Sequence, residues 1–184
     1  MIITDRDKAV LDFLNKFKIA TTSTIAELFY PSLRYAQDRL LKLYKAKFIK
    51  RSRNDFTQEY CYYIKQKPKQ LRHHLLLTDF YREMHKIADI ELFEKEVYME
   101  GVHPDGVIAY KYKNKGYIAC IEIHISHNPL NLKKYEKFYY SNKYKKYFPV
   151  FPLIFVITDR KIPQTKLKVI QVNENMSNLK EVLI

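Results

Sequence analysis

Residues 32–53 read SLRYAQDRLLKLYKAKFIKRSR, a helical pattern that runs into a strongly basic strand pattern. Ser32 can cap a helix, because its hydroxyl can accept a hydrogen bond from a backbone N–H of the first turn. Apolar residues then recur at helical spacing from Leu33 to Tyr44, with polar and basic residues between them. Residues 48–53 begin apolar and end in three cations, as in a surface strand. The segment predicts an amphipathic helix followed by a basic strand.

Two further helices are expected before this segment. Thr4 fits a capping position with Asp7 in the first turn, and the apolar residues within 10–17 follow at helical spacing. A second helix is expected to begin at residues 21–23 and to stop before Pro31, which cannot continue a helix. The first 45 residues therefore predict three helices in succession.

A second strand is expected over residues 57–64, joined to the first by the turn-forming pair Asn54-Asp55. Three helices and a basic hairpin form the layout of a winged helix-turn-helix, in which the third helix enters the major groove of DNA and the hairpin lies along a phosphate backbone. The expected DNA-binding residues lie on these two elements and are Arg34, Gln37, Arg39, Lys42, Lys50, Arg51 and Arg53. Two alternatives remain: the cations form an ordinary solvated face, or the domain serves protein contacts.

The charge of the chain favours an anionic partner. Its 184 residues carry 33 Lys and Arg against 20 Asp and Glu, a net charge of +13. Residues 1–70 hold 15 of the basic and 7 of the acidic side chains, so they are the more basic part per residue. Codon bias of an AT-rich genome is the competing explanation, since Lys, Tyr, Ile and Asn are all abundant while Gly numbers 3 and Trp 0.

Composition also bounds the class of protein. A hydrophobic content of 47% suffices for a folded core. No run approaches the ~18 to 20 apolar residues of a membrane span, and the N-terminus does not resemble a signal peptide. Cys61 and Cys120 are too few for a disulfide framework. We expect a cytoplasmic protein without membrane contact, made of a domain over 1–67, a polar linker and a domain over 71–184.

The second domain has a hairpin with acidic residues near one end. Residues 102–110 and 117–124 predict two strands around a turn that contains Asn and Gly. Folding this hairpin brings Asp105 opposite either Glu122 or His124, depending on the register. Two carboxylates there would suit Mg²⁺, which prefers oxygen ligands and can activate water for attack on a phosphate. The alternative is an ordinary hairpin in which Asp105 belongs to a turn and Glu122 is salt-bridged.

Helices and strands are expected on both sides of this hairpin. The patterns predict a helix over 71–88, a helix over 131–146, and buried strands over 151–158 and 167–172. The helix over 131–146 mixes lysines with aromatic residues, which can stack bases and bind phosphates or can simply cover the sheet. The chain as a whole is predicted to be α+β, with an α/β second domain.

The spacing within the second domain resembles the PD-(D/E)xK nuclease superfamily. Pro104-Asp105 corresponds to the first motif of that superfamily, and Glu122-Ile123-His124 to its acid-x-lysine motif. Glu83, on the preceding helix, corresponds to the acid that many members carry there. The resemblance implies a nuclease-like fold, with Asp105, Glu122 and Glu83 as the metal ligands if Mg²⁺ is bound.

His124 departs from that motif, because the superfamily has a catalytic lysine at this position. A histidine is mostly neutral at pH 7 and is a poorer phosphate clamp. Lys133 or Lys137 on the next helix could supply the missing cation. If the site is active, the catalytic set would be Asp105, Glu122, His124 and Lys133. The substitution favours a scaffold without catalysis and without a cofactor.

Over nearly its whole length, the chain resembles the replication-relaxation family of plasmid and mobile-element proteins. The matching stretches are residues 3–7, 20–29, 39–49, 104–105, 122 and 133–139. The resemblance implies a protein that binds double-stranded DNA and acts in replication, maintenance or mobilisation of plasmid, phage or integrative-element DNA. A homodimer and contacts with replication or mobilisation proteins are the expected assemblies. The alternatives are a Mg²⁺-dependent endonuclease of the PD-(D/E)xK type and a winged-helix transcriptional regulator.

Overall fold

The computed structural model describes residues 1–54 and 57–183, and these fall into two compact units, Met1–Arg82 and Glu83–Ile184. The expected boundary lay in residues 68–70, whereas the division falls inside helix α4 (Leu71–Ile87). The first turns of α4 belong to unit 1, because Leu75 packs into a small core there with Ile19 and Cys61. Asp55, expected in a turn, lies outside the described residues.

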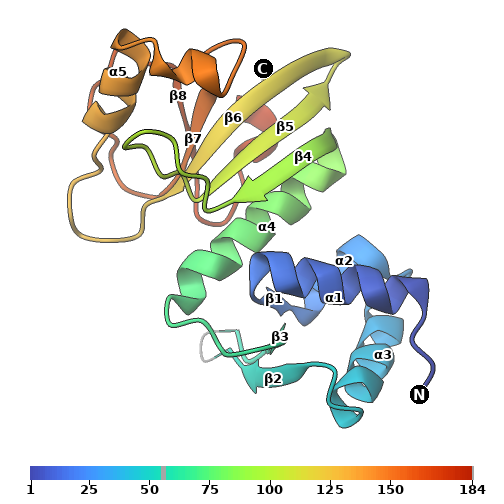
Figure 1. The fold of residues 1–184 in the computed structure, drawn as a ribbon. Coiled ribbons are helices and arrows are strands. Elements are labelled where there is room, and N and C mark those ends of the chain that lie inside the picture. The colour runs from blue at the N-terminus through green and yellow to red at the C-terminus, as the bar shows by residue number, and fades with distance from the viewer. Residues whose placement is uncertain (55–56, 184) are drawn as a thin grey trace. The chain divides into compact units, whose positions relative to one another are not determined.

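Unit 1 consists of helices and a small antiparallel sheet (Figure 1). Its elements before α4 are α1 (Asp5–Phe17), β1 (Ala20–Thr21), α2 (Thr22–Phe29), α3 (Leu33–Lys45), β2 (Lys50–Arg53) and β3 (Tyr60–Tyr63). The three strands are ordered β1-β3-β2. The three predicted helices are present, and the two predicted strands are shorter than expected. The two-residue strand β1 was not predicted, since two residues carry no readable period.

The three helices begin where the sequence places their caps. Thr4 and Asp7 form a capping box at α1, in which each side chain bonds the backbone N–H of the other. Thr21 accepts from the backbone N–H of Thr24 at α2, and Ser32 accepts from that of Tyr35 at α3. Each hydroxyl satisfies a backbone donor that a helix leaves unpaired, which fixes where the helix starts.

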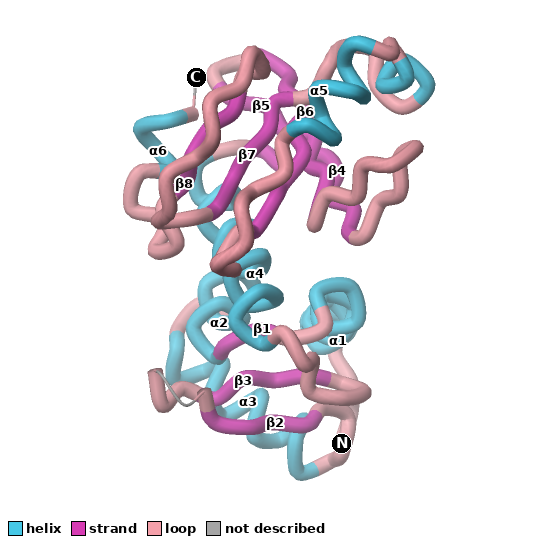
Figure 2. The backbone as a smooth tube through the Cα atoms, turned by 90° about the vertical axis from the view of Figure 1, so that its left-hand side faces the viewer, coloured by secondary structure: helices cyan, strands magenta, loops and turns pink. Residues whose placement is uncertain are grey.

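Unit 2 is built on a five-stranded sheet, whose strands lie side by side in Figure 2. Its elements are β4 (Asp89–Lys95), β5 (Gly106–Tyr112), β6 (Lys115–Ile123), α5 (Lys133–Tyr140), the 3₁₀ helix η1 (Lys143–Lys146), β7 (Leu153–Ile157), β8 (Val169–Val172) and α6 (Leu179–Val182). The order is β4-β5-β6-β7-β8, antiparallel from β4 to β6 and parallel from β6 to β8. With unit 1, this makes the chain an α+β protein, as predicted.

Two left-handed turns shape unit 2, one in the β5–β6 loop and one after α5. Lys113 and Asn114 have φ of 49° and 60°, the left-handed values that a two-residue hairpin loop requires. This loop sets the register of β5 against β6. Asn142 has φ 56° and ψ 13°, which ends the helical path there. The helix predicted over 131–146 is therefore two pieces, α5 and η1.

Candidate functional site

The exposed side of α3 carries the first group of predicted DNA-binding residues. Ala36, Leu40 and Leu43 are buried on its inner side, while Arg34, Gln37 and Lys42 are exposed. Nε of Arg34 lies 3.3 Å from Oδ2 of Asp38, and the Arg34 side chain stays 84% exposed. An exposed ion pair of this kind contributes little to stability, so the guanidinium can exchange its carboxylate for another anion.

Arg39 has a different position from the other predicted DNA-binding residues. Its Nε donates to Oδ1 of Asp7 at 2.8 Å, and its Nη2 donates to the other oxygen of Asp7 and to the carbonyl oxygen of Ile2 at 2.9 Å. The Asp7 side chain is buried, and the hydrogen bonds from Arg39 hold its pKa at about 2. Arg39 therefore ties α3 to the start of α1.

The β2–β3 hairpin carries the second group. The Arg51 guanidinium lies 4.4 Å from the ring centre of Tyr44 and 4.2 Å from that of Tyr60. Arg53 lies 5.0 Å from the same Tyr60 ring, and Nζ of Lys50 donates to the carbonyl oxygen of Lys65 at 2.8 Å. Cation–π contacts restrict a guanidinium without neutralising its charge. The hairpin thus presents positive charge in a fixed arrangement.

In unit 2, the register of the sheet places Asp105 opposite Glu122. Val107 pairs with Cys120 and Gly106 with Ile121, so the next pair along the ladder is Asp105 and Glu122. The backbone N–H of Asp105 donates to the carbonyl oxygen of Ile121 at 2.8 Å, and Oδ2 of Asp105 accepts from the N–H of Ile123 at 2.7 Å. The Asp105 carboxylate therefore continues the ladder beyond the last residue of β5. The sequence left open whether Asp105 faces Glu122 or His124, and the structure has it opposite Glu122.

Glu122 is buried and has two close donors on α5. Its Oε1 accepts from Nζ of Lys134 at 2.7 Å and from the Tyr135 hydroxyl at 2.5 Å. Burial raises the pKa of Glu122, and Asp105 adds to this, while Lys134 and Tyr135 oppose it. The cation beside Glu122 is thus Lys134, whereas the sequence pattern predicted Lys133 or Lys137 in this role. All three lysines fall within about one turn of α5, and spacing alone does not distinguish which of them faces the sheet.

Of the three carboxylates predicted to bind a cation, Glu83 is not grouped with the other two in the described part of the chain. In the described part of the chain, no three His, Cys, Asp or Glu side chains lie close enough to hold a metal ion together. Glu83 therefore does not join Asp105 and Glu122, and its Oε1 lies 2.9 Å from Nζ of Lys86. At Glu122, the Lys134 ammonium already supplies the compensating positive charge. A cation bound there would have to compete with Lys134 for Oε1 of Glu122.

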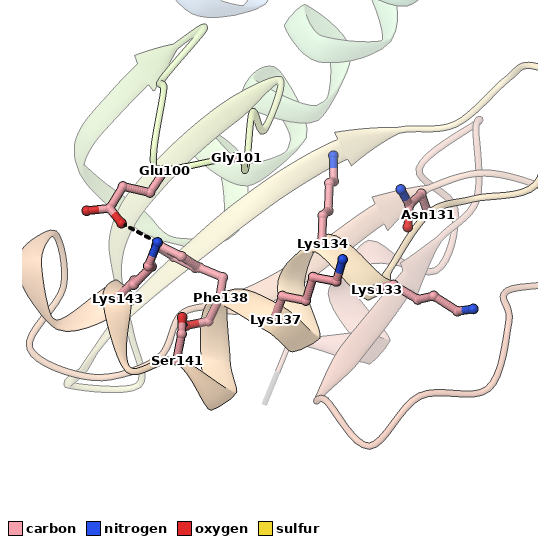
Figure 3. A pocket seen from close by; sticks show the side chains of 9 residues that line it. All are labelled: Glu100, Gly101, Asn131, Lys133, Lys134, Lys137, Phe138, Ser141 and Lys143. Atoms are coloured by element: carbon pink, nitrogen blue, oxygen red, sulfur yellow. Dashed lines mark hydrogen bonds and ion pairs between the residues drawn. The ribbon is translucent and has the colours of Figure 1, made fainter.

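The remaining predicted residues lie around this pair. The backbone N–H of His124 donates to the carbonyl oxygen of Ile157 at 3.0 Å, just beyond the end of β6. Lys133 and Lys137 are exposed on α5 and line a pocket of about 480 Å³ (Figure 3). We call it the lysine pocket; its lining consists of Glu100, Gly101, Asn131, Lys133, Lys134, Lys137, Phe138, Ser141 and Lys143.

Comparison of the chain with models of protein families, with characterised proteins and with solved structures finds no match. No helix within the described residues is long and apolar enough to cross a membrane.

Proposed function

We propose that this protein binds double-stranded DNA and that unit 1 is a winged helix-turn-helix. The observation that carries the proposal is the order of its elements: three capped helices, a short strand after the first of them, and a basic hairpin that completes a β1-β3-β2 sheet. In such a domain, α3 enters the major groove and the hairpin contacts the phosphate backbone.

The side chains on these two elements have the chemistry that DNA requires. On α3, Arg34 and Gln37 would contact base edges or phosphates, and Lys42 would contact a phosphate. On the hairpin, Arg51 and Arg53 keep their charge while the Tyr60 ring holds them in place. Arg39 is left out of the proposed interface, because Asp7 already occupies its guanidinium.

We further propose that unit 2 is a PD-(D/E)xK-like scaffold that no longer cleaves DNA. The support is the ion pair between Glu122 and Lys134, which neutralises the acid that would hold a cation. In this proposal the whole chain acts in replication, maintenance or mobilisation of plasmid, phage or integrative-element DNA. Unit 1 supplies the duplex contact, and unit 2 adds contacts of its own.

A titration of the full chain into a labelled mixed-sequence duplex, followed by fluorescence anisotropy, tests the central part of this proposal. We expect binding by the wild type and a weakening of about fivefold or more in a Lys42→Ala, Arg53→Ala variant, because each substitution removes a phosphate contact. Lys16→Ala is the control, since Lys16 is an exposed lysine on α1. Equal affinities in the three proteins, with circular dichroism showing all three folded, would remove the assignment.

A second candidate is a Mg²⁺-dependent endonuclease, which the position of Asp105 opposite Glu122 favours. Nicking of supercoiled plasmid in Mg²⁺ or Mn²⁺ tests it, with an Asp105→Asn, Glu122→Gln variant beside the wild type. Nicking that the variant loses would make the protein an enzyme. Intact plasmid together with retained duplex binding would support the non-cleaving scaffold.

A further inference from the structure

We propose that the lysine pocket of unit 2 binds a phosphate group. The pocket is separate from the proposed duplex-binding elements, which all belong to unit 1, and neither Asp105 nor Glu122 lines it. Its volume of about 480 Å³ lies within the usual range of small-ligand sites. The proposal therefore concerns a second anion site and does not depend on the function of unit 1.

The charge of the pocket is the first argument. Four lysines line it, at positions 133, 134, 137 and 143, against one carboxylate, Glu100. Three of the four come from two turns of α5, and Lys143 comes from η1. Figure 3 shows Lys134 and Lys137 extending from the same side of α5, with Lys143 at the Glu100 end of the pocket. So many ammonium groups around one cavity favour a ligand with more than one negative charge.

The ion pairs around the pocket are the second argument, because they show which of its lysines already contact a carboxylate. Lys134 is held by Glu122 at 2.7 Å, and Lys143 by Glu100 at 2.9 Å. Lys146 holds the other oxygen of Glu100 at 2.6 Å, so this carboxylate is shared between two ammonium groups. The two carboxylates position the walls of the pocket but do not cancel its charge.

Lys133 and Lys137 are the available pair. They lie one turn apart on α5, both are exposed, and in the described part of the chain neither takes part in a recorded ion pair or side-chain hydrogen bond. The same holds for the Asn131 side chain at that end of the pocket. Two ammonium groups and an amide supply several hydrogen-bond donors, and charge-assisted bonds of this kind suit phosphate oxygens.

The interruption after α5 explains why the pocket is hollow. The left-handed Asn142 turns the chain, so η1 folds back and brings Lys143 toward Glu100. Gly101, next to Glu100 in the chain, has φ +94°, and apart from its chain neighbours no atom lies within 4 Å of where a Cβ would stand, so space is open there. A straight helix over 131–146 would not have placed Lys143 in this wall.

Two sources could supply the phosphate: the backbone of a nucleic acid, or a free nucleoside phosphate or oligophosphate. Isothermal titration of the full chain with inorganic tripolyphosphate tests the shared chemistry. The test variant is Lys133→Ala, Lys137→Ala, and the matched control is Lys161→Ala, Lys166→Ala, which removes the same charge from exposed positions of unit 2 outside the pocket. We expect the test variant to bind about tenfold or more weakly and the control to bind like the wild type.

A second arm separates the sources, using a labelled single-stranded oligonucleotide and the same three proteins. Weakened binding by the test variant, with displacement of the oligonucleotide by tripolyphosphate, assigns the site to a nucleic-acid backbone. Unchanged oligonucleotide binding beside a loss of tripolyphosphate binding assigns it to a free phosphate compound. The proposal is overturned if the wild type does not bind tripolyphosphate, or if the test and control variants bind it with equal affinity. Duplex binding through unit 1 is read separately, so the two proposals can fail independently.

Discussion

Nζ of Lys134 lies 2.7 Å from Oε1 of Glu122, and this ion pair joins helix α5 to β6, the central strand of the sheet in unit 2. The Glu122 side chain is 11% exposed and that of Lys134 25%, so water solvates neither charge fully. The Tyr135 hydroxyl donates to the same carboxylate oxygen. A carboxylate at this position would otherwise be costly, because burial disfavours its charged form.

Removal of Lys134 should therefore destabilise unit 2. We expect Lys134→Met to lower the free energy of unfolding by about 2 kcal/mol, since it leaves a buried carboxylate without its positive partner. The double variant Glu122→Gln, Lys134→Met should recover most of that loss. Urea denaturation measures both, with Lys133→Met as the exposed control. A Lys134→Met protein as stable as the Lys133→Met control would contradict this role.

Arg39→Ala should affect stability more than DNA affinity. The substitution removes the hydrogen bonds to the buried Asp7 carboxylate and should cost about 2 kcal/mol at neutral pH. Duplex affinity, measured where the variant is still folded, should change less than in Lys42→Ala. The reverse ranking in parallel urea and anisotropy titrations would return Arg39 to the DNA interface.

The same pair gives a pH dependence with a defined sign. The pKa of Asp7 falls from 3.8 to about 2 in the folded protein, so the stabilisation is present above pH 3.8 and is lost as the pH drops toward about 2. The difference in unfolding free energy between wild type and Arg39→Ala should therefore shrink over that window. Urea titrations of the two proteins at neutral pH and at about pH 2 measure it. A difference that stays constant would mean that Arg39 stabilises the fold through a group other than the Asp7 carboxylate.

The two cysteines should resist thiol reagents in the native protein. Both are buried, and burial raises the pKa of Cys61 to about 11 and that of Cys120 to about 12, so little thiolate is present at neutral pH. We expect Ellman's reagent to react slowly with the native chain and fully with both thiols in guanidinium. Because Cys61 is in unit 1 and Cys120 in unit 2, Cys61→Ser and Cys120→Ser variants report the opening of each unit separately. Fast native labelling at either position would show that its unit opens readily.

The sequence predicted the local features of unit 1 well, because each is set by neighbouring residues. The capping hydroxyls of Thr4, Thr21 and Ser32 mark the three helix starts, and Pro31 separates two of the helices. Features that depend on distant partners were not predicted. The Arg39 side chain looks like a free cation in the sequence, and only the fold brings it to Asp7, 32 residues away.

In the candidate site of unit 2, too, the features set by neighbouring residues were predicted and those set by distant ones were not. Strand alternation and the hairpin loop were enough to bring Asp105 and Glu122 together in one of two registers. The choice of Lys134 over its neighbours depends on how α5 rotates against the sheet, which spacing does not determine. The lysine pocket depends on the left-handed Asn142, which helical periodicity does not reveal.

The dependence of duplex affinity on salt tests the central claim, DNA binding through α3 and the hairpin, most directly. We predict that the binding constant of the wild type falls steeply as salt rises, because several phosphates are neutralised. Lys42→Ala should lower the magnitude of the slope of log K against log salt by about 1, while Lys16→Ala leaves it unchanged. A flat salt dependence in the wild type, or the same slope in Lys42→Ala as in the wild type, would contradict the account.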